Sequence, residues 1–162
     1  MITENDLYEE ANRFLEEHYD MLLTIPIKIN KEFITEQGAF EHTKFGVPIA
    51  IHIAQFVLDF ADDDVVYDVL HHELVHFVLF CKGEPFFDGH PVFETELNRL
   101  GVSSTKSGYL GRYHVYQCHG CSKDIVTPRY VTDTTGLVSV CCDATFSHTG
   151  RQHIYTGKRR IY

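Results

Sequence analysis

The sequence lacks any apolar run long enough to cross a membrane. No stretch of about 18 consecutive apolar residues occurs among its 162 residues, whereas a transmembrane helix needs about 20. Met1 also leads directly into the acidic residues Glu4 and Asp6, without the basic and apolar segments of a signal peptide. We therefore expect no transmembrane helix, no signal peptide and no membrane partner, and a cytoplasmic location.

Cysteine is scarce, and its number is odd. The five residues are Cys81, Cys118, Cys121, Cys141 and Cys142. An odd number without an export signal argues against a disulfide framework. Four of the five fall late in the chain, which favours metal binding over disulfides. The fifth, Cys81, is expected to be a small buried apolar residue.

Repeats and low-complexity segments are also absent, and 44% of the residues are hydrophobic against 23% charged. This composition can form a core, so we expect one domain plus a small appendage.

The charge is distributed unevenly along the chain. Residues 1–110 carry 7 Lys and Arg against 20 Asp and Glu, whereas residues 111–162 carry 7 Lys and Arg against 3 Asp and Glu. We place the boundary between residues 1–108 and residues 109–162, and the basic tail of the second part could attract nucleic acid.

Hydrophobic periodicity predicts a mixed α+β chain. Apolar residues at helical spacing predict helices, and short alternating or β-branched segments predict strands. The expected helices cover Thr3–Tyr19, residues 62–81 and His90–Leu100. The expected strands are Pro26–Asn30, Val47–Ile53, Tyr113–Tyr116, Tyr130–Thr132 and Leu137–Val140. We therefore expect a small sheet with a helix pair, followed by a small β-rich segment.

The segment His72-Glu73-Leu74-Val75-His76 carries the strongest chemical signal. Two histidines four residues apart project from one face of a helix, so both rings can reach one zinc ion at about 2.0–2.1 Å. Glu73 can act as general base toward a water that the metal activates. The surrounding helix is strongly apolar, and buried polar side chains need partners. The pattern therefore predicts a catalytic zinc and hydrolysis of peptide bonds.

A catalytic zinc needs a third protein ligand and one open position. His90 follows His76 by fourteen residues, after a loop containing glycines that lets the chain fold back. Glu94, one helical turn later, is the competing ligand, and we favour His90. Asp88 is expected to hold a ligand in place or, more simply, to be a turn residue. His71 is expected to face away from the metal.

Most of residues 45–101 resembles the SprT-like family of zincin metalloproteases, in particular its short bacterial members. The resemblance rests on residues 49–53, 68–77, 88–93 and 97–101. It implies a zincin-like core in which His72, His76 and His90 bind zinc and Glu73 is the base. It also implies a protein or peptide substrate, which in some relatives is protein crosslinked to DNA, and a C-terminal zinc ribbon.

Cys118-His119-Gly120-Cys121 is typical of half of a zinc ribbon. A ribbon has a second C-x-x-C about 15–20 residues later. The chain instead reads Cys141-Cys142-Asp143-Ala144, with alanine at the expected fourth position. Cys142, His148 or His119 could complete a tetrahedral site for a second, structural zinc. The alternative is a ribbon fold that persists without metal.

Tyrosines and basic residues alternate through residues 109–162. They are Tyr109, Arg112, Tyr113, Tyr116, Lys123, Arg129, Tyr130 and Lys158–Arg160. Such pairs suit single-stranded nucleic acid, although tyrosines also pack the cores of ribbons. Two functions are therefore open. The first is a zinc-dependent metallopeptidase, and the second is a non-catalytic, zinc-stabilised adaptor that binds nucleic acid or protein.

Overall fold

The computed structural model describes residues 2–104 and 110–156, and it confirms a mixed α+β chain. The helices in these residues are α1 (Glu4–Tyr19), α2 (Gln55–Phe60), α3 (Asp63–Cys81) and α4 (Pro91–Leu100). The strands are β1 (Ile27–Asn30), β2 (Gly38–His42), β3 (Pro48–Ala54), β4 (Leu110–Cys118), β5 (Asp124–Thr127) and β6 (Phe146–Thr156). We call residues 2–104 the N-terminal body and β4, β5 and β6 the second sheet.

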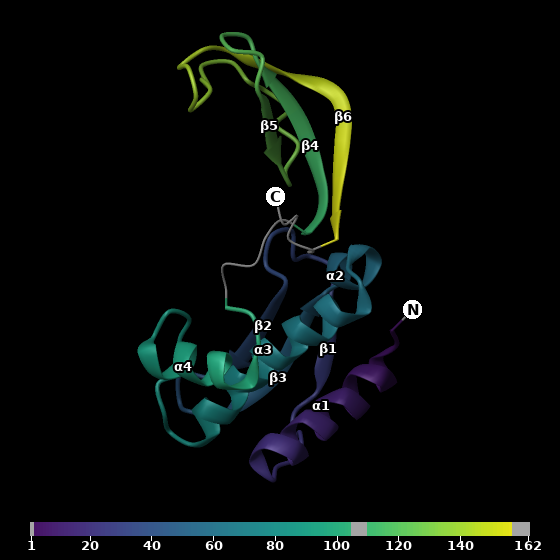
Figure 1. The fold of residues 1–162 in the computed structure, drawn as a ribbon, viewed down its shortest axis with the longest axis vertical. Helices are drawn as coiled ribbons and strands as arrows, with labels where there is room; N and C mark the ends of the chain where they lie inside the picture. The colour runs from purple at the N-terminus through teal and green to yellow at the C-terminus, as the bar shows by residue number, and fades with distance from the viewer. Residues whose placement is uncertain (1, 105–109, 157–162) are drawn as a thin grey trace.

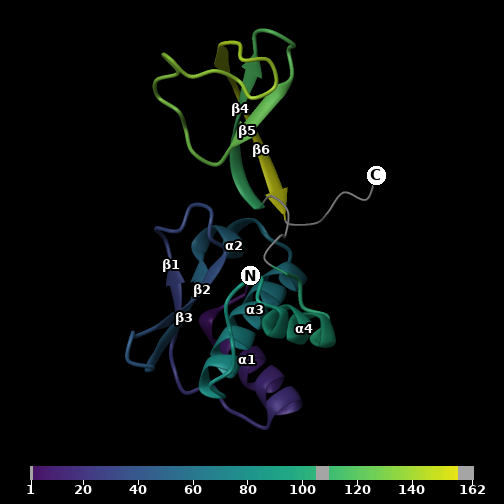
Figure 2. The same cartoon turned by 90° about the vertical axis from the view of Figure 1, so that its left-hand side faces the viewer.

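Strands β1, β3 and β2 form the sheet of the N-terminal body, with β3 in the centre. β1 runs parallel to β3 and β2 runs antiparallel to it, so β2 lies at an edge. Helix α3 packs against β2 and β3, and α1 packs against α3 and β1 (Figures 1 and 2). The core between them includes Leu7, Leu15, Ile51, Ile53, Leu70 and Leu74. Polar side chains in the middle of α3 are therefore buried.

The second sheet is antiparallel, with the order β5-β4-β6. It extends away from the N-terminal body, and it meets that body at α2 (Figures 1 and 2). Leu110 is buried in the core of the body. A Cβ atom on Gly111 would lie 3.1 Å from the ring of Phe56, and its φ of +92° also favours glycine. The expected boundary at residues 108 and 109 lies outside the described residues.

The strands expected at Tyr130–Thr132 and Leu137–Val140 are wrong. Both segments belong to the loop of residues 128–145, between β5 and β6. Their β-branched residues favour strands, but strand propensity depends on neighbours in a sheet, and these residues have none. The N–H of Val131 instead donates to the hydroxyl of Tyr116 at 2.7 Å. The loop is thus fixed by side chains and turns.

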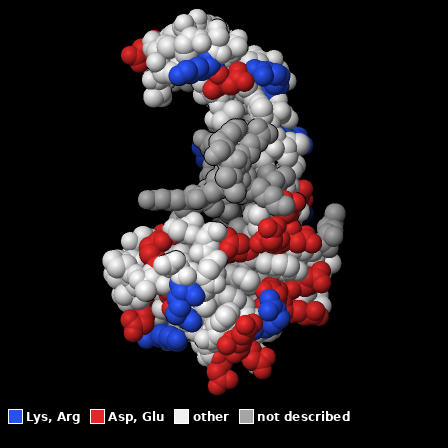
Figure 3. Space-filling view, in the orientation of Figure 1, with Lys and Arg blue, Asp and Glu red and all other residues white. Residues whose placement is uncertain are grey.

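Acidic side chains cover more of the visible face of the N-terminal body than basic ones do (Figure 3). The second sheet shows both signs on this face, and Arg151 of β6 pairs with Asp124 of β5 at 2.8 Å. Tyr109 and the basic residues Lys158–Arg160 lie outside the described residues, so their part in binding nucleic acid stays a prediction. Within the described part of the chain, no helix has the length and apolar character to cross a membrane.

Candidate metal centres

The predicted motif residues lie together in the middle of α3. His72, Glu73 and His76 are buried, with 9%, 6% and 9% of their surface exposed. One ligand atom from each lies within 4.8 Å of the others. Asp63 and Asp64 in the first turn favour the helix through its dipole, and its apolar residues pack around the motif. The helix thus brings two imidazoles and a carboxylate into one buried group that can hold a metal ion.

Each motif histidine is oriented by a backbone carbonyl. Nδ1 of His72 donates to the carbonyl of Ser103 at 2.9 Å, and Nδ1 of His76 donates to the carbonyl of Phe86. Because a carbonyl oxygen only accepts, the proton of each neutral ring lies on Nδ1, and Nε2 carries a lone pair. Hydrogen bonds of this kind orient the histidines of metal sites. The rings are therefore held ready to bind a cation through Nε2.

The carboxylate of Asp88 meets both histidines. Its Oδ1 atom lies 3.1 Å from Nε2 of His72 and 3.3 Å from Nε2 of His76. With both rings protonated on Nδ1, these three atoms are all acceptors, and their lone pairs repel one another. A cation between them would remove the repulsion. A second proton on the ring of His76 would also remove its part of the repulsion, but burial lowers the pKa of His76 and so disfavours that proton, although Asp88 opposes this.

Glu73 lies against strand β2. A Cβ atom on Gly38 would lie 2.8 Å from both Cγ and Oε1 of Glu73, so the side chain fills space that a glycine leaves open. The N–H of Phe40 donates a hydrogen bond to the carboxylate. Burial, followed by the charge of Asp88, raises the pKa of Glu73 to about 8, although the Phe40 bond lowers it. Sequence reasoning missed Gly38, whose one signal is a glycine within a strand.

The structure does not bring His90 or Glu94 into this group. His90 is the N-cap of α4, and its Nδ1 accepts a hydrogen bond from the N–H of Val92 at 3.2 Å. Glu94 accepts from the N–H of Gly89 through Oε1 at 3.0 Å. Ligation by His90 therefore stays a prediction. Asp88 was expected to be a partner of a ligand or a turn residue, and its contacts with His72 and His76 agree with the first of these roles.

A second candidate centre lies at the end of β4 that is remote from the N-terminal body (Figure 1). The Sγ atoms of Cys118, Cys121, Cys141 and Cys142 all lie within 4.8 Å of one another. Cys118 is buried at the end of β4, and the other three are exposed. Four thiolates in this arrangement can hold a metal ion, and zinc takes such a donor set.

Cys142 joins this group where the spacing of a ribbon predicts Ala144. The turn at Gly120 lies against both residues, because a Cβ there would lie 3.0 Å from the Cβ atoms of Cys142 and of Ala144. The other two candidates are used elsewhere. His119 bonds to the hydroxyls of Thr145 and Ser147, and His148 packs against Tyr116 and Tyr130. The adjacent pair of cysteines thus takes the place of a second C-x-x-C.

The thiol of Cys118 is more acidic than an ordinary cysteine, because its pKa is lowered. A hydrogen bond with the hydroxyl of Ser139, 3.1 Å away, is the main cause that lowers its pKa to about 6. A lowered pKa favours the thiolate, which is the form that binds metals.

Cys81 lies outside the cluster, in the last turn of α3. It is exposed and not buried as expected, because Val78 and Leu79 take the buried positions of this turn and Cys81 is the last residue of the helix.

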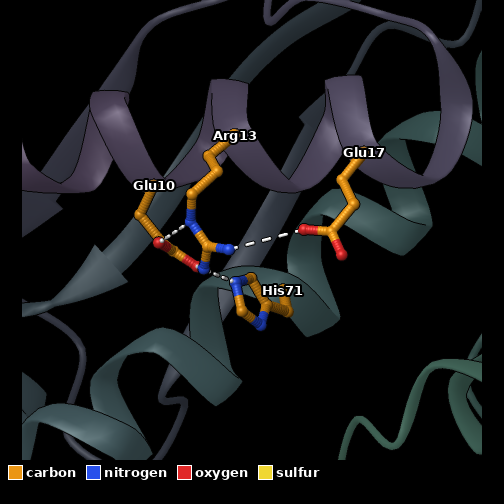
Figure 4. Close-up of polar contacts among 4 residues, drawn as sticks. All are labelled: Glu10, Arg13, Glu17 and His71. Atoms are coloured by element: carbon orange, nitrogen blue, oxygen red, sulfur yellow. Dashed lines mark hydrogen bonds and ion pairs between the residues drawn. The ribbon is translucent and has the colours of Figure 1, made fainter.

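His71 faces away from the motif, as expected, and ties α3 to α1. Its Nε2 lies 2.7 Å from Oε1 of Glu10 (Figure 4). Its ring also stacks on Phe14, with 4.1 Å between the centroids. Arg13 also contacts Glu10, at 2.6 Å, and reaches Glu17 at 3.4 Å. Burial lowers the pKa of His71, although Glu10 opposes this. The contact fixes the helix that carries the motif.

No family model matches the chain, and a search of the curated proteins finds no match.

Proposed function

We propose that the chain is a zinc-dependent metallopeptidase with its catalytic centre in α3. The observation that carries the proposal is the meeting of Nε2 of His72, Nε2 of His76 and Oδ1 of Asp88 beside a buried carboxylate. Two ring nitrogens and a carboxylate oxygen that meet as acceptors repel one another. A divalent cation would stabilise all four, and histidine with carboxylate donors suits zinc.

The residues of the site would divide the chemistry between them. His72 and His76 would hold the ion, which when bound lowers the pKa of water to about 7 and polarises a carbonyl group. Glu73 would accept the proton of the attacking water and pass it to the leaving amine. The N–H of Phe40 and the space beside Gly38 would orient its carboxylate for this step. The resemblance to SprT-like proteins and a zincin-like core are part of the same proposal.

The four cysteines would bind a second, structural zinc. All four positions would be filled by protein, which leaves no open site for a substrate.

A competing function follows from this cysteine centre. A ribbon-like second sheet remote from the histidines would suit an adaptor that binds nucleic acid or protein, with the cluster of His114, Tyr130 and His148 as a stacking surface.

The test is Glu73→Gln, which keeps the histidines but removes the base. Hydrolysis of unfolded casein and of DNA-bound protein should fall by about 10²–10⁴-fold, with the metal content unchanged. Glu84→Gln, in an exposed loop of the same body, is the matched control and should keep full activity. Activity that persists in Glu73→Gln would overturn the peptidase proposal. If neither protein cleaves but DNA retards both on a gel, the adaptor function is favoured.

A further inference from the structure

We infer that Cys121 and Cys141 are a site of reversible oxidation, at which hydrogen peroxide joins their sulfur atoms in a disulfide. The inference goes beyond the proposed peptidase, because it concerns the cysteine centre and not α3. Its second part, the release of a metal ion from this centre, rests on the structural zinc of the proposed function. The formation of the disulfide rests on the arrangement of the thiols alone.

The two thiols meet at the exposed side of the cysteine centre. The Sγ atom of Cys121 lies 3.5 Å from that of Cys141, and both residues are exposed. A disulfide bond is about 2.05 Å long, so the two sulfur atoms need to approach by about 1.5 Å. Both residues lie in turns and not in strands, so no sheet pairing opposes this movement. Exposure together with a neighbouring thiol is typical of cysteines that are oxidised reversibly.

Cys118 is protected from the same reaction. Only 1% of its surface is exposed, and its sulfur is hydrogen-bonded to the hydroxyl of Ser139 and to the N–H of Gly120. An oxidant has to reach the sulfur atom, so reactivity depends on exposure as well as on thiolate character. Burial therefore keeps Cys118 reduced, although its lowered pKa favours the thiolate.

Cys142 is the alternative partner, since it is exposed and belongs to the same cluster. A bond between Cys141 and Cys142 would join residues whose Cα atoms are about 3.8 Å apart, closer than the about 4.4–6.8 Å usual for disulfides. The Sγ atom of Cys142 also lies against the turn at Gly120, 3.5 Å from where a Cβ would be. Cys141 is therefore the better partner for Cys121.

The step balances with hydrogen peroxide as the oxidant. The thiolate of Cys121 attacks one peroxide oxygen, the O–O bond breaks and hydroxide leaves, so that a sulfenic acid forms. The thiolate of Cys141 then attacks this sulfur, the S–O bond breaks and a second hydroxide leaves. The two sulfur atoms lose two electrons, the peroxide gains them, and each hydroxide takes up a proton to give water.

The disulfide would remove two of the four donors of the cysteine centre. The remaining two thiolates fall short of the four ligands of a structural zinc site, so the ion would leave. The new bond would tie the turn after β4 to the loop of residues 128–145 in place of the ion. A thiol reductant would reverse the reaction by exchange and restore the four donors.

The test treats the full, zinc-loaded chain with hydrogen peroxide beside a chromogenic zinc chelator, and maps disulfides by mass spectrometry after acid quenching. We expect a disulfide between Cys121 and Cys141, peroxide-dependent release of about one zinc per chain, and reversal by dithiothreitol. Cys142→Ser should still form this disulfide, which makes it the matched control for Cys141→Ser. Cys81, an exposed thiol outside the cluster, should appear in no disulfide within the chain.

The unchanged chain alone can overturn the inference, so a variant that folds poorly does not weaken the test. A disulfide between Cys121 and Cys142, or zinc released without any disulfide, would refute the assignment. If peroxide neither releases zinc nor forms the disulfide, the oxidation site fails while the structural zinc stands. If untreated Cys121→Ser holds as much zinc as the unchanged chain, but the unchanged chain still forms the disulfide, the structural zinc fails and the oxidation site stands.

Discussion

Gly38 and Glu73 are packed so closely that a single added carbon atom would separate them. A Cβ on Gly38 would lie 2.8 Å from Cγ and Oε1 of Glu73, inside the distance of any real contact of this kind. The edge strand β2 therefore fixes the position of the proposed base, although it lies far from the motif in sequence.

Replacing Gly38 with alanine should push the carboxylate of Glu73 away from β2 and from the N–H of Phe40. Hydrolysis should fall by about 10–100-fold, because a misplaced catalytic group loses much of its effect. Metal content should not change, since His72 and His76 are untouched. The measurement combines a steady-state peptidase assay with elemental analysis.

Ala39→Ser on the same strand is the matched control, because it adds an atom without approaching Glu73. Thermal unfolding of both variants separates loss of activity from loss of the fold. Full activity in Gly38→Ala, with the folded state intact, would contradict the role given to β2.

The cysteine centre predicts a loss of one metal ion per chain when a thiolate is removed. Cys121→Ser should lower the zinc content by about one equivalent and destabilise the loop of residues 128–145, because metal binding contributes directly to the folding of such sites. The catalytic ion should stay. Elemental analysis measures the first effect, and proteolysis of the loop measures the second.

Cys81→Ser provides the control, since Cys81 is an exposed thiol outside the cluster. Its zinc content should match that of the unchanged chain. An equal zinc content in Cys121→Ser would argue that the four thiols hold no metal.

The sequence predicts the parts of these centres that depend on local spacing. Two histidines four residues apart share a face of any helix, so the meeting of His72 and His76 needs no knowledge of the rest of the fold. Gly38 and Asp88 reach the site through a sheet edge and a loop, and spacing along the chain does not encode either approach. This is why Gly38 was missed, and why the contact of Asp88 with both histidines was not predicted.

The second sheet shows the same limit. β-branched residues at Leu137–Val140 predicted a strand, but a strand needs a partner, and β4 pairs with β5 and β6 instead. In the same way, the C-x-x-C spacing pointed to position 144, whereas in the structure the Sγ atom of Cys142 lies with those of the other three cysteines. In both cases the outcome depends on contacts between segments distant in sequence.

The contact between α1 and α3 predicts a measurable loss of stability. Glu10→Gln replaces a carboxylate that contacts both His71 and Arg13 (Figure 4). The free energy of unfolding should fall by about 0.5–1.5 kcal/mol, the usual contribution of one hydrogen bond. Urea denaturation measures it. Glu17→Gln, whose carboxylate is exposed and lies 3.4 Å from Arg13, should change stability by less than about 0.5 kcal/mol. Equal losses of unfolding free energy in both variants would contradict the stabilising role given to the contacts of Glu10 with His71 and Arg13.

The pH dependence of stability should report the contact between α1 and α4. Glu96 accepts hydrogen bonds from Arg99 and from the hydroxyl of Tyr19, and Arg99 is the main cause that lowers the pKa of Glu96 to about 2. The pKa of Glu96 is thus lower in the folded state than in the unfolded chain, where it is about 4.3. The ionised carboxylate therefore stabilises the fold at pH values above about 4.3. That contribution should disappear as the pH falls from about 4.3 toward about 2.

Glu96→Gln isolates this effect. At pH 6 the variant should be less stable than the unchanged chain, and the difference in the free energy of unfolding should shrink steadily below about pH 4.3, because the protonated glutamate then resembles glutamine. Denaturation at several pH values measures the difference, with Glu9→Gln on the exposed face of α1 as the control. A difference that stays constant down to about pH 2 would mean that Glu96 acts through packing and not through its charge.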